Sequence, residues 1–130
     1  MTFVDTSFWV ALQFRDDANH RTARTLWARP REAMLTTNHV MGETWTFLRR
    51  RLGFHPALEF FKAATRIAAL TMIHVEDAAE REAWNWLARH DERSYSFVDS
   101  TSFAVMRRRR VREALAFDGD FSAAGFVELR

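Results

Sequence analysis

Short apolar runs alternate with longer amphipathic stretches along this chain, and that alternation limits its possible folds more than any other feature. The runs have the length of buried strands and occupy residues 2–4, 33–36, 71–75, 114–117 and 126–129. Apolar side chains recur at helical spacing in the stretches between them, at residues 8–14, 19–27, 38–52, 56–70, 76–89 and 96–106. Alternating strands and helices predict an α/β fold with a short, mainly parallel central sheet flanked by helices.

The bulk composition predicts one compact domain that spans residues 1–130. The chain has 130 residues, and 48% of them are hydrophobic, which is enough to build one core. It contains no cysteine, which excludes disulfides and cysteine nucleophiles and favours the reducing cytoplasm. The longest stretch without Asp, Glu, Lys or Arg, residues 33–42, has about half the length of a membrane span. We therefore expect a cytoplasmic protein that is not bound to a membrane.

Arginine supplies nearly all of the positive charge, because Lys62 is the only lysine. Arginines cluster at residues 49–51 and 107–110. Because guanidinium groups match the geometry of phosphate, these clusters favour contact with a polyanion. The two clusters can equally be solvated C-terminal ends of helices, because the helix dipole stabilises cations there.

Acidic side chains occupy positions where apolar residues are expected. Each one either follows an apolar run or lies within an apolar helical stripe: Asp5, Glu43, Asp99, and the pair Asp118 and Asp120. Burying an ionised carboxylate without a partner costs several kcal/mol or forces protonation. Ligands of parallel sheets collect beyond the carboxyl ends of the strands, where Asp5 and Asp118 fall. Several acids that converge there indicate a cation, and a hard divalent metal is the natural candidate.

Each acid also has a simpler explanation when it is taken alone. Asp5 and Asp99 are suitable N-cap residues, and Asp118 followed by Gly119 is a common turn. Glu43 can reach water or an arginine from the edge of its stripe. One architecture nevertheless brings all of these acids to the same end of one sheet, and independent caps do not require that.

Other chemistries lack their motifs in this sequence. It has no GxGxxG, no P-loop, no HExxH and no GxSxG, and its five histidines are scattered without metal-ligand spacing. The tryptophans could stack on nucleobases, but within helical stripes they are more typical of core or interface residues. We interpret them in that way; they are Trp9, Trp27, Trp45, Trp84 and Trp86.

Four motifs in this order resemble a PIN-domain ribonuclease, and more narrowly a VapC-type toxin of a toxin–antitoxin pair. The resemblance covers nearly the whole chain. Residues 3–7 (FVDTS) and 37–44 (TNHVMGET) resemble the first two acidic motifs of the family. Residues 95–106 (YSFVDSTSFAVM) and 114–121 (ALAFDGDF), followed by Gly125 and Phe126, resemble its C-terminal motifs and are the most specific part.

The resemblance implies a three-layer PIN-like domain and a set of site residues. It implies that the catalytic acids also bind Mg²⁺, with Mn²⁺ able to substitute: Asp5, Glu43, Asp99 and Asp118. Asp118 is favoured as the fourth acid, and Asp120 can share its role. Thr6 and Ser102 are expected as supporting hydroxyls that hydrogen-bond a carboxylate or a water of the metal. A homodimer and a VapB-type antitoxin that blocks the site are also implied.

The resulting hypothesis is a Mg²⁺- or Mn²⁺-dependent endoribonuclease toxin that hydrolyses RNA phosphodiester bonds. Two alternatives stay open on the sequence alone. One is a non-catalytic PIN-like module that binds RNA or a protein, which the presence of all four acids disfavours. The other is a structure-specific DNA nuclease, which the small size of the chain disfavours.

Overall fold

The computed structural model describes residues 1–31 and 33–130, and within them the chain forms five strands and seven helices. They follow one another in the order β1 (Thr2–Val4), α1 (Thr6–Gln13), α2 (His20–Trp27), β2 (Met34–Thr37), α3 (Asn38–Arg51), α4 (Phe54–Thr65), β3 (Leu70–Ile73), α5 (Asp77–Leu87), α6 (Phe97–Arg109), β4 (Glu113–Leu115), α7 (Asp120–Ala123) and β5 (Val127–Glu128). In this described part of the chain, no helix is long and apolar enough to cross a bilayer.

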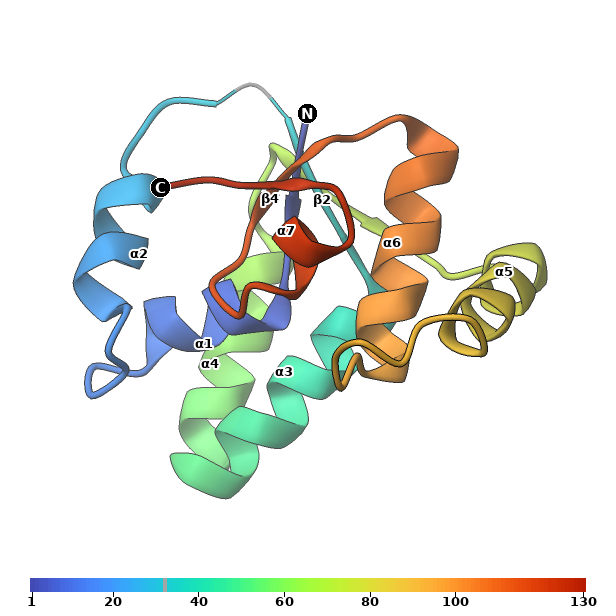
Figure 1. The fold of residues 1–130 in the computed structure, drawn as a ribbon. Coiled ribbons are helices and arrows are strands. Elements are labelled where there is room, and N and C mark those ends of the chain that lie inside the picture. Colours follow the sequence, from blue (N-terminus) through green and yellow to red (C-terminus); the bar gives the residue numbers. More distant parts are fainter. Residues whose placement is uncertain (32) are drawn as a thin grey trace.

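The strands form one parallel sheet in the order β3-β2-β1-β4-β5, with β1 at its centre. The first strand pairs with β2 through Phe3 and Leu35, and with β4 through Phe3 and Ala114. Figure 1 shows α1 and α2 to one side of the sheet and α6 with α5 to the other, so the sheet is the middle of three layers. The predicted α/β class with a parallel sheet flanked by helices is confirmed.

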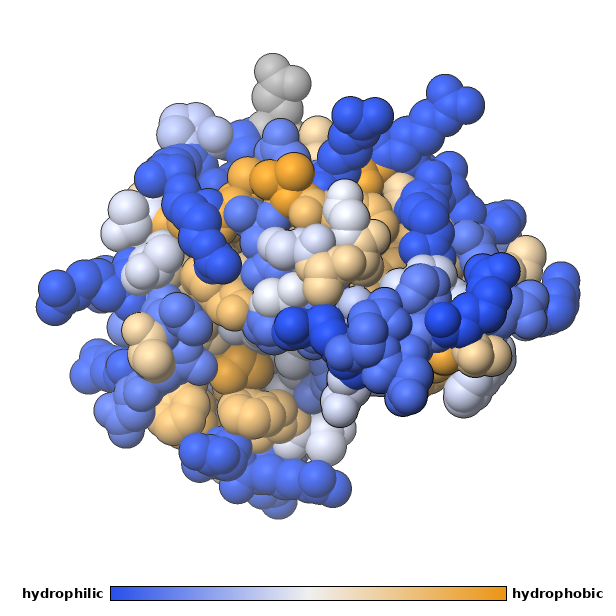
Figure 2. Space-filling view, viewed as in Figure 1, coloured by the Kyte–Doolittle hydropathy of each residue, from blue (hydrophilic) through white to orange (hydrophobic). Residues whose placement is uncertain are grey.

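An aromatic core fixes α6 against the centre of the sheet. Phe3 on β1, Phe103 on α6 and Phe121 on α7 are fully buried, and the ring of Phe121 lies 5.9 Å from that of Phe3 and 4.9 Å from that of Phe103. Hydrophilic side chains cover the rim of the face in Figure 2, and apolar side chains show between them. Because large buried rings stabilise a fold strongly, the core holds β1, α6 and the segment after β4 in fixed relative positions.

Parallel strands all present their carboxyl ends at the same edge of the sheet, and several helices begin there. In Figure 1 β1 runs downward from the N-terminus, and α1 begins directly below it. Helix α3 follows β2 without a loop, because the Thr37 hydroxyl accepts a hydrogen bond from the Val40 amide and caps the helix. The edge therefore gathers residues that are distant in sequence.

Most element boundaries differ from the predicted ones by one to five residues, and one short helix was not predicted. The helix predicted over residues 56–70 ends at Thr65, and Leu70 already belongs to β3. Strand β4 ends at Leu115 instead of residue 117. The short helix α7 is not predicted, because the carboxylate that caps it comes from another element: Glu128 on β5 accepts hydrogen bonds from the amides of Gly119 (3.2 Å) and Ser122 (2.8 Å).

Candidate metal centre

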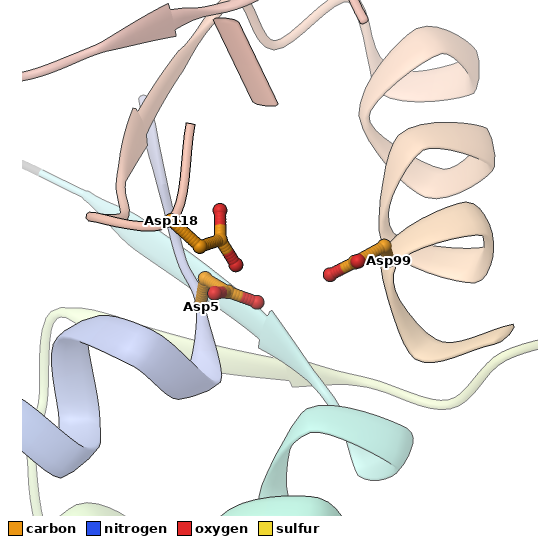
Figure 3. A group of neighbouring side chains, drawn as sticks. All are labelled: Asp5, Asp99 and Asp118. Atoms are coloured by element: carbon orange, nitrogen blue, oxygen red, sulfur yellow. The ribbon is translucent and has the colours of Figure 1, made fainter. Parts of the chain in front are cut away.

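Three aspartates meet at the carboxyl edge of the sheet. Asp5 follows β1, Asp99 lies in the first turn of α6, and Asp118 lies between β4 and α7. One carboxylate oxygen of each lies within 4.8 Å of the other two. Figure 3 shows the three side chains pointing toward one another from these separate elements. Asp5 and Asp99 are buried and Asp118 is exposed, so the cluster is open to solvent on the side of Asp118.

Local hydrogen bonds fix the two buried carboxylates. Asp5 is the N-cap of α1, and its Oδ2 accepts from the Ser7 amide at 3.0 Å and the Ser7 hydroxyl at 2.7 Å. Asp99 forms a capping box with Ser96, in which Asp99 Oδ2 accepts from the Ser96 amide at 3.0 Å. Each carboxylate therefore has one oxygen held by the backbone. The other oxygen of Asp5, Oδ1, is buried and has no hydrogen-bond partner.

The segment that carries Asp118 is tied to the rest of the site from two sides. The Phe117 amide donates to the Ser7 hydroxyl at 3.0 Å, which links this segment to β1 and α1. Arg93, in the loop between α5 and α6, donates to the Asp118 carbonyl at 3.2 Å and to Asp120 Oδ1 at 2.8 Å. At Gly119 the chain turns in the left-handed region (φ 81°), which glycine adopts without strain.

The crowding of these acids favours their protonated forms. Burial raises the pKa of Asp5 to about 8, and the negative charge of Asp118 adds to the shift, although hydrogen bonds from Ser7 oppose it. Burial also raises the pKa of Asp99 to about 7 and that of Asp118 to about 6. Near neutral pH the cluster therefore holds protons that a divalent cation would displace.

The cluster fits a hard divalent cation. Carboxylate oxygens are the ligands that such ions prefer, and the buried Asp5 Oδ1 lacks any other partner. Unpaired buried acceptors are rare in folded proteins because they lose their hydration without compensation. A divalent cation held by Asp5, Asp99 and Asp118 would give this oxygen a partner and would offset the repulsion among the three carboxylates.

The other predicted site residues have different surroundings. Glu43 and Thr6 line the same cavity of about 500 Å³ as the three aspartates. The Thr6 hydroxyl is buried without a hydrogen-bond partner. Asp120 also lines this cavity, and its carboxylate is paired with Arg93. Ser102 is buried in α6, and its hydroxyl donates to the Val98 carbonyl at 2.9 Å, one turn earlier, instead of to a carboxylate.

Ser7 and Arg93 are site residues that the sequence analysis did not single out. The signal for Ser7 is its place two residues after an aspartate N-cap, where its amide and hydroxyl both reach the carboxylate. Arg93 carries no such signal, because its partners lie 25 and 27 residues away along the chain.

Replacing Ser7 by alanine should weaken both catalysis and folding. The change removes one donor to Asp5 and leaves the partly buried Phe117 amide without its acceptor. Loss of a group that orients a metal ligand typically costs about 10- to 100-fold in activity. An unpaired buried amide costs about 1–3 kcal/mol of unfolding free energy. Cleavage rates and urea denaturation measure the two effects.

Thr25→Ala is the matched control, because the exposed Thr25 hydroxyl on α2 bonds only to the Arg21 carbonyl of its own helix. Equal behaviour of the two variants would show that the Ser7 bridge does not position the site.

The comparison with known families agrees with this site. The PIN domain family model matches residues 2–127, and the chain belongs to that family. The chain is 56% identical over 131 residues to the 23S rRNA-specific endonuclease VapC20 of Mycobacterium tuberculosis, from the strains CDC 1551 and H37Rv. The alignment covers 100% of this chain and 98% of that protein.

The fold agrees equally well with a solved structure. The crystal structure of M. tuberculosis VapC20, a sarcin–ricin loop cleaving toxin, superposes with a TM-score of 0.94 at 55% sequence identity. The superposition covers 100% of this chain and 99% of the VapC20 chain. The predicted resemblance to PIN-domain ribonucleases of the VapC type is confirmed, and so is the endoribonuclease class.

Proposed function

We propose that this protein is a divalent-metal-dependent endoribonuclease toxin that cleaves the sarcin–ricin loop of 23S rRNA. The observation that carries the proposal is the cluster of Asp5, Asp99 and Asp118, which brings three carboxylate oxygens within 4.8 Å of one another. Full-length identity of 56% to a 23S rRNA-specific endonuclease supports the choice of substrate.

In this proposal Asp5, Asp99 and Asp118 hold Mg²⁺, for which Mn²⁺ can substitute, and Glu43 aids binding or orients a water from the cavity wall. A bound ion would lower the pKa of the attacking water and would neutralise the negative charge that develops on the phosphate. The chain itself supplies position: Ser7 and Ser96 hold the buried carboxylates by hydrogen bonds. Thr6 and Asp120 line the same cavity and act as supporting groups.

The surroundings of the cluster favour an open site for a polyanion. Asp118 faces solvent, so a phosphate can approach from that side while Asp5 stays buried. Attack in line with the leaving oxygen then produces a 5′-phosphate and a 3′-hydroxyl. Arg93 keeps the segment of Asp118 in place by its bond to the Asp118 carbonyl.

Further parts of the proposal come from the family. We infer a homodimer in the cytoplasm and a VapB-type antitoxin that binds the toxin and blocks access to the aspartates. The sequence of the neighbouring gene tests whether an antitoxin exists. A short open reading frame that encodes a DNA-binding N-terminal region supports the antitoxin.

Metal removal is the direct test of the catalytic part. We expect the purified protein to cleave a stem–loop RNA that carries the sarcin–ricin sequence in the presence of Mg²⁺. EDTA should stop the reaction, and added Mg²⁺ or Mn²⁺ should restore it. Sequencing of the product ends gives the cleavage position, and a DNA stem–loop of the same sequence is the control. Cleavage that continues in EDTA, or cleavage of the DNA at the same rate, would contradict the proposal.

A further inference from the structure

A groove of about 820 Å³ runs along α3, next to the metal cluster. Its walls come from α3 and the start of α6, and include His39, Glu43, Phe47, Arg50, Arg51 and Phe97. Glu43 and Phe47 also line the cavity that contains the three aspartates. The two hollows therefore adjoin, and a chain that passes the aspartates can continue into the groove.

One end of this groove carries Phe97, whose ring stacks on a tryptophan just outside the groove. Phe97 lines the groove, and its ring lies 4.4 Å from that of Trp84 on α5, with an interplanar angle of 27°. Trp84 stays 57% exposed in spite of this contact. One face of the indole packs on Phe97, and the residue as a whole remains open to solvent. Phe97 also precedes the catalytic Asp99 by only two residues.

The other end of the groove carries positive charge. Arg50 and Arg51 line it and are exposed. The Arg51 guanidinium lies 5.6 Å from the ring centre of Phe14 and 5.5 Å from that of Phe47, so cation–π contacts hold it in place. No neighbouring carboxylate pairs with either arginine among the ion pairs of the described residues.

Stacked rings at one end and free guanidinium groups at the other suit one strand of nucleic acid. Proteins that hold single strands combine cations along the phosphates with aromatic side chains on which bases stack. A paired base has both faces covered by its neighbours, so only an unpaired base can use such a surface. Loops of RNA offer bases of this kind.

We propose that the Trp84–Phe97 pair is a stacking site for one unpaired RNA base next to the cleaved phosphate, with the adjoining strand lying along α3 toward Arg50 and Arg51. The proposal rests on the ribonuclease function proposed above. It makes Trp84 and Phe97 residues that hold an unpaired nucleotide beside the scissile bond, whatever its base.

Variants of Trp84 test this stacking site in single-turnover cleavage of the sarcin–ricin stem–loop. Trp84→Ala should raise the half-saturating RNA concentration about 10-fold, because the variant no longer stacks on one base. The cleavage rate at saturating RNA should change less than about twofold. Trp84→Phe keeps an aromatic face and should stay within about threefold of the wild type. Phe61→Ala is the matched control, because Phe61 is 44% exposed on α4 and does not line the groove.

A series of stem–loops that each lack one base around the cleavage site identifies the stacked nucleotide. When the stacked base is the one removed, the wild type should bind the abasic RNA about 10-fold more weakly than the intact RNA. Trp84→Ala should bind that abasic RNA and the intact RNA equally well. Equal losses for Trp84→Ala on every abasic RNA would overturn the proposal.

The same variants separate this proposal from its alternatives. If Trp84→Ala lowers the molar mass measured by sedimentation, the pair contacts a second copy of the chain, which also overturns a base-stacking role. If the wild type does not cleave the RNA with Mg²⁺, the proposed function itself fails. If the wild type cleaves and Trp84→Ala has an unchanged half-saturating concentration, only the stacking site fails.

Discussion

Asp99→Asn and Asp5→Asn should each lower RNA cleavage by about 10³-fold or more, while the protein stays folded. Asparagine keeps the shape of the side chain but removes the negative charge that binds a divalent ion. Removing a group that only orients a metal ligand costs about 10- to 100-fold, so the loss of a ligand should exceed that range. Initial rates on the sarcin–ricin stem–loop at saturating Mg²⁺ measure the effect.

The same variants should be more stable than the wild type when no metal is present. At pH 7.5 each replacement removes an acid whose ionised form the folded state disfavours, because burial and, to a smaller extent, the neighbouring aspartates raise its pKa. We expect a gain of about 1–3 kcal/mol in unfolding free energy. Asp77→Asn on α5 is the control, because Asp77 is exposed and distant in sequence from all three aspartates. Full activity of Asp99→Asn, or a large loss of stability in EDTA, would contradict the assignment of these aspartates.

The metal-free wild type should lose stability as the pH rises from about 5 to 9. The pKa values of Asp5 and Asp99 in the folded protein are about 8 and about 7, above the value of 3.8 expected for an unfolded aspartate. At pH values between the unfolded pKa and the folded pKa values, the folded state binds more protons than the unfolded state. The free energy of unfolding therefore decreases as the pH rises. The stabilisation that comes from these bound protons is complete below about pH 4. It is lost as the pH rises through the pKa values of the folded protein.

Thermal melts in EDTA across this pH range measure the effect, and we expect the melting temperature to fall by roughly 5–10 °C. Mg²⁺ should offset the fall at pH 8, by about 2.7 kcal/mol at a hundredfold excess over its dissociation constant. At pH 5 the same addition should change little, since protons compete with the ion. A shallower fall of the melting temperature for Asp5→Asn than for the wild type confirms that Asp5 is one source of the pH dependence. A melting temperature that rises from pH 5 to 8 in EDTA would mean that the cluster is not protonated.

Periodicity in the sequence was enough to predict the parallel α/β class and most of the elements. It could not predict that a residue serves two roles at once. Asp5 is the N-cap of α1 and Asp99 belongs to a capping box, so the simpler interpretation of each residue is correct. Both are nevertheless part of the aspartate cluster, because the sheet places the start of α1 beside the start of α6. The parallel sheet predicted from the sequence indicated that the acids converge at one edge, but which carboxylates meet there depends on the tertiary structure.

Contacts between elements account for what the sequence did not predict. The tryptophans were interpreted as core or interface residues, and Trp9, which is 1% exposed, agrees with that interpretation. Trp84 is not a core residue, because it lies outside the buried stripe of Ala79, Ala83 and Trp86, and an interface role for it stays a prediction. The ring on which it stacks belongs to α6, so no pattern within α5 could reveal the pair. The Ser7 bridge to Phe117 joins residues 110 positions apart and has no local signal either.

The order of the strands makes one site depend on two distant parts of the sequence. The central strand β1 lies at Thr2–Val4, but its neighbour β4 lies at Glu113–Leu115 and is followed by the segment with Asp118. A fragment that ends before residue 113 therefore lacks one of the three aspartates and leaves one side of β1 unpaired. The central sheet and the acidic cluster are thus completed by the same segment, and neither is complete without it.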